Sequence, residues 1–172
     1  MGISQSPPGR KLVKCKWVYK TKFVIDGSSL KYKEILVSKG YSQVLGIYYN
    51  ETFAPVEKID SIRIALAIAA SKQWEVHHLD VKCDFINGDI NEEIYMQKTE
   101  GFVSNPSLVR KLNKSLYGLK QAPKAWYANI DGFMLSLSFV RCKSDPNVYL
   151  KLIHGYLMII VIYVDDLLII II

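Results

Sequence analysis

The last third of the chain consists of apolar, β-branched runs separated by short polar breaks. Such runs favour strands, and the breaks fall at His154-Gly155 and Asp165-Asp166, which predicts two hairpin turns. The three expected strands are residues 147–153, 155 or 156 to 164, and 167 onward. The second turn therefore carries two adjacent carboxylates between two of the most apolar segments of the chain.

The first half predicts a hairpin, a loop and a helix. Residues 16–22 and 31–41 read as two strands joined by a turn at Asp26-Gly27. After a loop to residue 55, Asp60 or Ser61 can cap a helix that runs to residue 70. This helix is apolar nearly all round, so it is expected to be buried.

Short elements and a second helix fill the middle of the chain. A short strand, residues 76–80, delivers Asp80 at its end, Asn87-Gly88 marks a turn, and residues 93–97 predict another short strand. Pro123 opens a helix with one apolar stripe. The stripe is Trp126, Ile130, Phe133, Met134 and Leu137, and it is read as core rather than as a cofactor site. The whole pattern predicts an α+β fold, an antiparallel sheet with helices packed on one face.

Composition indicates a globular domain with a basic N-terminal part. Half of the 172 residues are hydrophobic, which excludes disorder as the default. Residues 1–40 carry nine Lys/Arg and two Asp/Glu, and residues 110–124 carry five Lys/Arg and no acid. An anionic polymer is the expected partner, with solvated surface lysines as the alternative.

The three cysteines and the chain termini indicate an intracellular protein. Cys15, Cys83 and Cys142 form neither a metal-ligand pattern nor a disulfide framework, which suits a reducing compartment. No signal peptide is visible, and the one apolar run of marginal membrane length, residues 156–172, has two Asp near its middle. We therefore expect a cytoplasmic location and no membrane; a membrane hairpin is a remote alternative.

The adjacent carboxylates of Asp165 and Asp166 suggest metal chemistry. Two such charges repel by about 4 kcal/mol at ~4 Å and an effective dielectric of about 20. A divalent cation relieves that repulsion, and clustered carboxylates with a metal are typical of phosphoryl transfer. A solvated Asp-Asp turn is the alternative, and Asp80 is the candidate third carboxylate.

Six ordered segments carry a resemblance to a known family. They are CKWVYK (15–20), VSKGYSQ (37–43), GIYYNETFAPV (46–56), LDVK (79–82), LYGLKQAP with AW (116–123, 125–126) and YVDD (163–166). In this order and spacing the chain resembles the reverse transcriptase domain of copia-type retrotransposons from about residue 14 onward. Residues 1–13 are then an N-terminal tail and residues 14–172 the domain.

The resemblance implies the fingers and palm of a right-handed polymerase. Asp80, Asp165 and Asp166 would be the catalytic, metal-binding carboxylates, holding two Mg²⁺ ions for nucleotidyl transfer. The expected partners are an RNA template, the RNA/DNA duplex, deoxynucleoside triphosphates and the rest of a Pol polyprotein.

Three residues match substrate-binding positions of the family. Phe85 matches the bulky residue that excludes ribonucleotides, with a core Phe as the alternative. Gln121 matches a residue of the nucleotide pocket, and Lys39 lies in the basic fingers strand, with a solvated lysine as the alternative. His77 and His78 point to opposite sides of a strand and are read as structural.

Three departures from the family pattern weaken the enzyme reading. Asp84 stands where Ala is usual, and Ile35 stands where an Arg grips the triphosphate. The chain also stops after the paired Asp, without thumb or ribonuclease H, so a fragment or remnant is expected. The rival reading is a non-catalytic nucleic-acid-binding remnant of the same domain.

Overall fold

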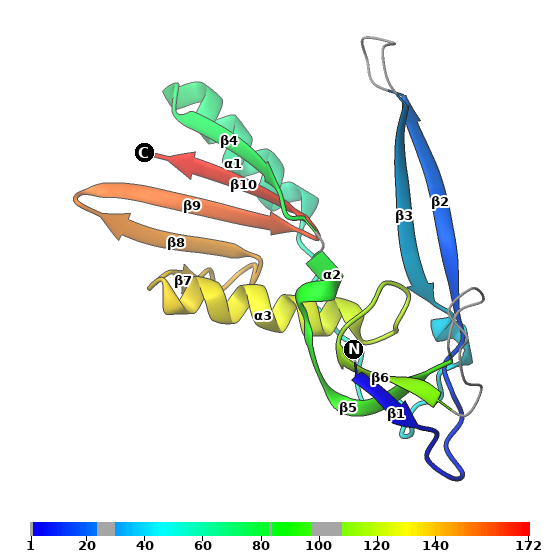
Figure 1. Ribbon diagram of the computed structural model, residues 1–172. Coiled ribbons are helices and arrows are strands. Elements are labelled where there is room, and N and C mark those ends of the chain that lie inside the picture. Colours follow the sequence, from blue (N-terminus) through cyan, green and yellow to red (C-terminus); the bar gives the residue numbers. More distant parts are fainter. Residues whose placement is uncertain (1, 24–29, 83, 98–107) are drawn as a thin grey trace. The chain divides into compact units, whose positions relative to one another are not determined.

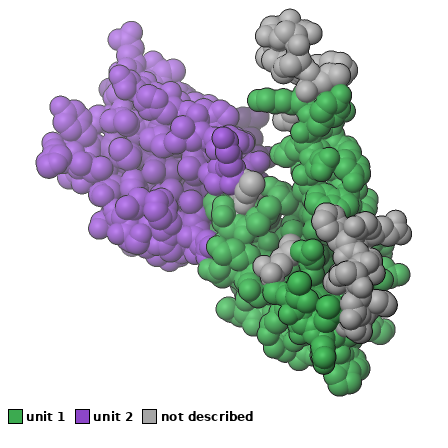
Figure 2. All heavy atoms as spheres, viewed as in Figure 1, with its two compact units in different colours: residues 1–52, 85–126 green, residues 53–84, 127–172 purple. Residues whose placement is uncertain are grey.

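The computed structural model describes the chain except residues 1, 24–29, 83 and 98–107 (Figure 1). The described residues form two compact units (Figure 2). Unit 1 contains residues 1–52 and 85–126, and unit 2 contains residues 53–84 and 127–172. Each unit is assembled from two separate segments, so neither is a continuous piece of sequence.

Unit 1 is built from two antiparallel sheets. The strands β2 (Cys15–Phe23) and β3 (Leu30–Ser38) form a two-stranded hairpin, as the sequence predicts. The other sheet has the order β1-β6-β5, from β1 (Gly2–Gln5), β6 (Leu108–Lys114) and β5 (Asp89–Met96). The short helices η1 (Gly40–Ser42) and α2 (Asp84–Asn87) complete the elements around it.

Several expected boundaries in this region shift. The return strand ends at Ser38, because Gly40–Ser42 forms a 3₁₀ turn, and the expected strand 93–97 is the end of a longer strand. Asn87 is the last residue of α2, which precedes Gly88, and the expected turn at Asp26-Gly27 lies outside the described residues.

The segment before residue 14 takes part in this unit. Strand β1 pairs with β6, and the backbone N–H of Val13 donates to the Tyr95 carbonyl at 2.9 Å. The Val13 side chain is fully buried in a cluster that includes Ile94, Met96 and Leu112. Burial of these side chains supplies most of the driving force for unit 1.

Two glycines let the segments around residues 40 and 118 meet backbone to backbone. A side chain at Gly40 would overlap the carbonyl oxygen of Gly118, and one at Gly118 would overlap that of Ser38. Gly118 also has φ +87°, a conformation that favours glycine. The Ser38 N–H donates to the Tyr117 carbonyl at 2.7 Å in the same contact.

Unit 2 is built around a five-stranded antiparallel sheet. Its order is β4-β10-β9-β8-β7, from β4 (Glu75–Asp80), β10 (Asp166–Ile171), β9 (Tyr156–Tyr163), β8 (Val148–Ile153) and β7 (Val140–Arg141). The three expected C-terminal strands are confirmed, and so is the turn at His154-Gly155, where both residues have positive φ (50° and 89°).

The two long helices lie on opposite faces of this sheet, which corrects the expected single helical face. The Tyr149 hydroxyl donates to Asp131 of α3 (Ala122–Ser136) at 2.9 Å, so α3 covers the face of Tyr149 and Ile160. Ile59 and Ile62 of α1 (Ile59–Lys72) line a cavity with Val161 and Leu168, which belong to the other face. The sheet is apolar on both faces, so each face can bury a helix.

Burial affects the ionisation of Tyr149 on the α3 face. Together with hydrogen bonding to Tyr127 and Asp131, burial raises the pKa of Tyr149 far above its usual value. The phenol therefore remains a neutral donor that ties β8 to α3.

Helix α1 differs from its prediction in its cap and in its burial. The N-cap is Lys58, which makes no side-chain capping bond, whereas Asp60 lies in the first turn. Only Ala69 is buried; Ile64, Leu66 and Ile68 are exposed by 59%, 41% and 43%. Helix α1 packs along one narrow stripe, because among the described residues the sheet contacts only that side of the helix.

The apolar stripe of α3 is confirmed in part. Trp126, Ile130 and Met134 are buried, but Phe133 and Leu137 are 55% and 42% exposed. The buried residues recur every four positions, so the helix contacts its surroundings along a narrower stripe than the sequence predicts.

Candidate active site

Strand pairing in unit 2 brings the predicted catalytic carboxylates together. Asp166, the first residue of β10, stands directly opposite Asp80, the last residue of β4. Directly opposed residues share a face, with Cβ atoms about 4.5–5.5 Å apart. The Val81 N–H then donates to the Asp165 carbonyl at 2.6 Å, which ties the end of β4 to the turn.

The turn is centred one residue earlier than predicted. Strand β9 ends at Tyr163 and β10 begins at Asp166, so the turn residues are Val164 and Asp165. Val164 has φ +52°, which is rare for a β-branched side chain and costs on the order of 1–3 kcal/mol. Such strain is typical of functional turns, and here it lies between the tyrosine and the two Asp.

The carboxylates are accessible, and one of them is already engaged. Asp80 is exposed, Asp165 and Asp166 are half-buried, and Asp166 Oδ1 lies 2.8 Å from His78 Nε2. In the tautomer that carries its proton on Nε2, His78 donates this hydrogen bond to the carboxylate oxygen.

The donor set suits Mg²⁺, although the side chains do not form a complete ligand group. Three carboxylates supply the hard oxygen ligands that Mg²⁺ prefers, and the register places two of them face to face. In the described part of the chain, however, no three His, Cys, Asp or Glu side chains are grouped so that they could hold a metal.

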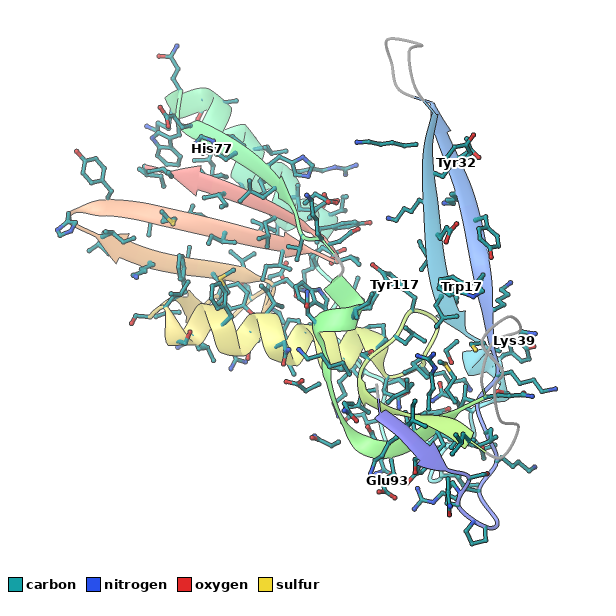
Figure 3. The ribbon with its side chains drawn as sticks, in the orientation of Figure 1. Trp17, Tyr32, Lys39, His77, Glu93 and Tyr117 are labelled. Atoms are coloured by element: carbon teal, nitrogen blue, oxygen red, sulfur yellow. The ribbon has the colours of Figure 1, made fainter. Side chains whose placement is uncertain are left out.

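The contact of His78 with Asp166 was not predicted from the sequence. His78 and Asp80 are two positions apart on β4, so they share a face of the sheet, and this parity could have indicated the contact. The other histidine, His77, lies on the opposite face, 3.6 Å from Glu75 (Figure 3). The two adjacent histidines therefore have different surroundings.

A small apolar cavity adjoins this contact within unit 2. It has a volume of about 270 Å³ and is lined by Ile59, Ile62, Val161, Leu168, Tyr163, His78 and Asp166. Four of its seven lining residues are aliphatic, so one side of the contact between His78 and Asp166 faces an apolar wall.

The three predicted substrate-binding residues lie in unit 1. The Phe85 ring contacts Tyr117 edge-on, with centroids 5.3 Å apart and planes at 86°, and it packs against the buried cluster of that unit. This packing fits the alternative reading of Phe85 as a core residue, although it also fixes the ring. Asp84, one position earlier, is the first residue of α2.

Gln121 is buried and hydrogen-bonded within the protein. Its Nε2 donates to the Tyr48 carbonyl at 2.9 Å, and its Oε1 accepts from Gln43 Nε2 at 3.1 Å. Gln43 Oε1 in turn accepts from the Lys120 N–H at 2.8 Å. These residues come from three of the family-like segments, which therefore hold each other in place.

Lys39 and Ile35 are partly exposed residues at the base of the β2–β3 hairpin. The Lys39 N–H donates to the Lys14 carbonyl at 2.7 Å. Ile35 stands opposite Val18 in the hairpin, where an apolar pair replaces the cation that the family pattern leads one to expect.

The hairpin has one cationic and one aromatic face. Lys20 stands opposite Lys33, and by alternation Lys16 and Lys31 share their face. The other face carries Trp17, Tyr19 and Tyr32, of which both tyrosines are strongly exposed (Figure 3). Facing lysines repel each other, so an anion between them would be stabilising.

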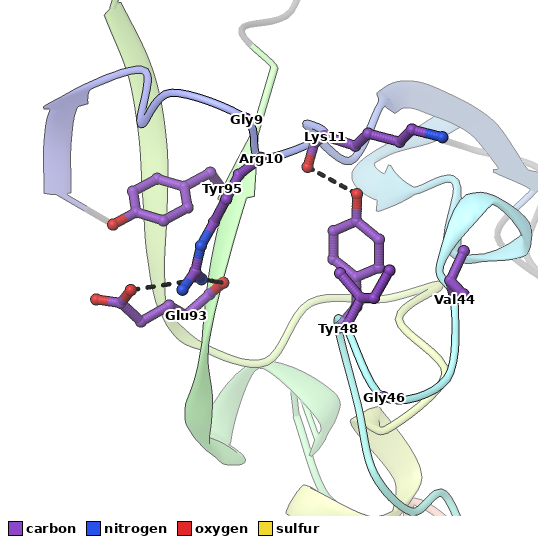
Figure 4. A pocket seen from close by; sticks show the side chains of 9 residues that line it. Gly9, Arg10, Lys11, Val44, Gly46, Tyr48, Glu93 and Tyr95 are labelled. Carbon is purple, nitrogen blue, oxygen red and sulfur yellow. Dashed lines mark hydrogen bonds and ion pairs between the residues drawn. The ribbon is translucent and has the colours of Figure 1, made fainter.

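A second cavity of about 340 Å³ lies in unit 1 (Figure 4). Arg10 enters it and pairs with Glu93 at 3.4 Å, and the Tyr48 hydroxyl donates to the Lys11 carbonyl at 2.8 Å. Glu93 also pairs with Lys111 at 2.6 Å, which holds the pKa of Glu93 below its usual value. The two charged side chains of Arg10 and Glu93 in this cavity are thus paired with each other.

The free cysteines Cys15 and Cys142 differ in their surroundings. Burial raises the pKa of the Cys15 thiol, whereas a hydrogen bond with Ser144 lowers that of Cys142. Cys83 lies outside the described residues.

Comparison with known proteins shows the family of the chain. Residues 2–171 match the family model described as reverse transcriptase (RNA-dependent DNA polymerase). The chain belongs to this reverse transcriptase family. Relatives named as retrovirus-related Pol polyproteins place the domain in the copia-type group: those from transposon TNT 1-94 of Nicotiana tabacum (48% identical over 98% of the chain) and from transposons RE2 and RE1 of Arabidopsis thaliana (42% over 97% and 41% over 95%).

The reverse transcriptase chain corresponds to a small part of these relatives. It spans 13%, 12% and 11% of the length of the three polyproteins. No solved structure matches it. None of the helices in its described part combines the length and the apolar character needed to cross a bilayer.

Proposed function

We propose that this chain supplies the catalytic part of an RNA-directed DNA polymerase, with unit 2 in the role of palm and unit 1 in that of fingers. The observation that carries the proposal is the register that sets Asp80 opposite Asp166, with Asp165 tied to the end of β4. Carboxylates at the ends of two strands and at the turn between them suit nucleotidyl transfer in a protein of the reverse transcriptase family.

In this proposal Asp80, Asp165 and Asp166 hold Mg²⁺. Bound there, two Mg²⁺ ions would supply Lewis-acid activation of the primer 3′-hydroxyl and stabilisation of the leaving pyrophosphate. The strained turn at Val164 presents Asp165, and the ladder between β4 and β10 fixes Asp80 and Asp166 at its edge.

The residues of unit 1 would act on the substrates. Phe85, fixed by Tyr117, would contact the sugar of the incoming deoxynucleoside triphosphate and exclude a 2′-hydroxyl. Gln121 would shape the nucleotide pocket through its buried hydrogen bonds, and Lys39 would neutralise phosphate.

The β2–β3 hairpin would bind the template or the RNA/DNA duplex. Its four exposed lysines on one face can pair with the phosphates of a nucleic-acid backbone, and its exposed aromatic rings can stack on bases. Both contacts tolerate any sequence, which a polymerase requires.

The test is primer extension by a chimera in which residues 2–171 replace the matching segment of the tobacco relative. This chimera should extend a DNA primer on an RNA template in Mg²⁺. Asp80→Asn, Asp165→Asn and Asp166→Asn should each lower kcat by about 100-fold or more, since even the hydrogen-bond partners of metal ligands are worth about 10–100-fold. Asp60→Asn, an exposed Asp of α1, is the matched control and should have full activity.

Two results would count against the proposal. Activity that survives Asp80→Asn would remove this residue from the site. A folded chimera that binds the RNA/DNA duplex but does not extend the primer would favour the non-catalytic alternative, with Ile35 and Asp84 as the first residues to revert to Arg and Ala.

A further inference from the structure

His78 and Asp166 form the contact in unit 2 that the family resemblance leaves unassigned. His78 Nε2 lies 2.8 Å from Asp166 Oδ1, although the two residues are 88 positions apart. We infer that His78 is a positioning residue for Asp166 and holds one carboxylate oxygen so that the other is presented to the metal. This inference rests on the proposed metal-binding function of Asp166.

The position of His78 in the sheet supports this role. His78 stands opposite Leu168 and Asp80 stands opposite Asp166, so His78 approaches Asp166 diagonally across the same face. His78 therefore approaches Asp166 from the position two residues before Asp80 on β4, whereas Asp80 stands directly opposite Asp166. The histidine can restrain Asp166 without standing between the two carboxylates.

A purely structural role explains His78 poorly. Its side chain is 66% exposed and lies on the edge strand, so it contributes little buried area. The Asp166 carboxylate is 40% exposed, so burial alone does not fix its orientation. One hydrogen bond, with Leu168 and Val161 forming the apolar wall beside it, limits that freedom.

Metal ligands commonly depend on such a partner. A hydrogen bond to a ligating carboxylate fixes its orientation, and loss of the partner typically weakens metal binding by about 10–100-fold. His78 satisfies the requirement because its Nε2–H engages only Oδ1 of Asp166.

The experiment uses Mn²⁺ as the probe and the 172-residue chain as the protein. Free Mn²⁺ is titrated by electron paramagnetic resonance against the parent and four variants, namely His78→Ala, His78→Gln, His77→Ala and Asp80→Ala. His78→Ala should raise the Kd for Mn²⁺ by about 10-fold or more. His78→Gln, which keeps an N–H donor at similar reach, should recover most of the affinity.

His77→Ala is the matched control, because it removes the adjacent histidine from the opposite face. It should leave the Kd unchanged. Circular dichroism and thermal unfolding of each variant check that the fold persists, which the exposure of both histidines favours.

The outcomes separate this inference from the proposed function. If Asp80→Ala weakens Mn²⁺ binding but His78→Ala does not, the positioning role is wrong and the metal site stands. If His77→Ala and His78→Ala have equal effects, or if Gln does not rescue, the role is also wrong. A parent that binds no Mn²⁺, or binds it equally well with Asp80→Ala, would overturn the metal assignment and the role of His78 together.

Discussion

The packing of Phe85 bears on its proposed role as a steric filter. Its ring meets Tyr117 at 86° and lies against the buried cluster of unit 1, so its position is fixed by the fold. A rigid ring is a better steric filter than a mobile one, because a clash with a 2′-hydroxyl cannot be relieved by rotation.

Replacing Phe85 tests this filter. In the chimera described above, Phe85→Ala should raise the ribonucleotide to deoxyribonucleotide ratio of kcat/KM by about tenfold or more, a change of ~1.4 kcal/mol in transition-state free energy. Single-nucleotide incorporation measures the ratio. Phe133→Ala, an exposed Phe on α3, is the control. An unchanged ratio with lowered stability would make Phe85 a core residue only.

At the residue scale the sequence indicated the carboxylates but not their surroundings. The apolar flanks of Asp165 and Asp166 indicated a hairpin, and the structure has one. Which two residues occupy its turn depends on the backbone, because Val164 adopts a φ that β-branched residues avoid and no sequence rule anticipates. The His78–Asp166 contact depends on long-range register, which single-strand patterns do not contain.

At the scale of elements, strands were more predictable than the burial of helices. The runs of Ile and Val in β9 and β10 favour a strand whichever face of the sheet is buried. These strands can therefore be predicted without knowing what packs against them. Apolar residues on α1 reveal a helix but not how much of it is covered, and most of them are exposed. The polar N-terminal segment gave no strand signal, yet Gly2–Gln5 pairs with β6.

Helix α1 begins at a cap supplied from a distant part of the chain. Asp145 Oδ2 accepts from the Lys58 N–H at 3.1 Å and from Ser61 Oγ at 2.6 Å. Asp145 Oδ1 accepts from the Asn147 N–H at 3.1 Å, so one buried carboxylate joins α1 to the start of β8. Ser61, which with Asp60 was one of two expected caps, donates a hydrogen bond to the Asp145 carboxylate instead.

Removing this carboxylate should destabilise unit 2. Asp145→Ala should lower the free energy of unfolding by about 1–2 kcal/mol, the usual worth of a cap, measured by urea denaturation. Asp60→Asn, in the first turn of the same helix, should change it by less than about 0.5 kcal/mol. Equal changes in the free energy of unfolding for both variants would mean that Asp145 contributes only its negative charge and not its specific hydrogen bonds.

The effect of Asp145 should also depend on pH. Burial alone raises its pKa, but the hydrogen bonds from Ser61, Asn147 and Lys58 outweigh burial and bring the pKa below the ordinary value of 3.8. A carboxyl group with a lowered pKa stabilises the folded state at any pH above its pKa in the unfolded chain. This stabilisation is lost as the pH falls through its pKa in the folded protein. The stability difference between the parent and Asp145→Asn should therefore be constant above about pH 5 and shrink below 3.8.

Glycine substitutions should have opposite signs at two positions. Gly118→Ala should destabilise the protein by about 2 kcal/mol or more, because a Cβ there overlaps the Ser38 carbonyl and φ is +87°. Gly132→Ala should stabilise it by about 0.5–1 kcal/mol, since Gly132 lies inside α3 with open space around it. Thermal unfolding measures both, and the same sign at both positions would contradict the close approach at Gly118.

At the scale of the whole molecule, charge is concentrated on the hairpin of unit 1. The basic excess of residues 1–40 was evident from the sequence, but its division into a lysine face and an aromatic face follows from the register of β2 and β3. This register places Lys20 opposite Lys33, and a phosphate backbone is the anion that would relieve their repulsion.

Neutralising these lysines should weaken nucleic-acid binding. Lys20→Gln with Lys33→Gln should lower the affinity of the chain for a labelled RNA/DNA duplex and reduce the slope of log K against log salt by about 2, roughly one for each lost phosphate contact. Lys72→Gln with Lys143→Gln removes the same charge from unit 2 and should leave the slope nearly unchanged. Equal changes would show that net charge alone drives binding. Fluorescence anisotropy across a salt series gives the slopes.

The order of strands in unit 2 also constrains when the proposed active site can form. Strand β4 is at the edge of the sheet and has β10 as its neighbour, yet His78 precedes Asp166 by 88 positions. At about 5–20 residues per second, translation leaves β4 waiting for roughly 4–18 seconds before its partner is made. During that interval its backbone groups are open to solvent or to a chaperone, and closing so long a loop is intrinsically slow. Asp80 thus meets the Asp that repels it only after the rest of the sheet has been synthesised, when enough structure exists to hold the two together.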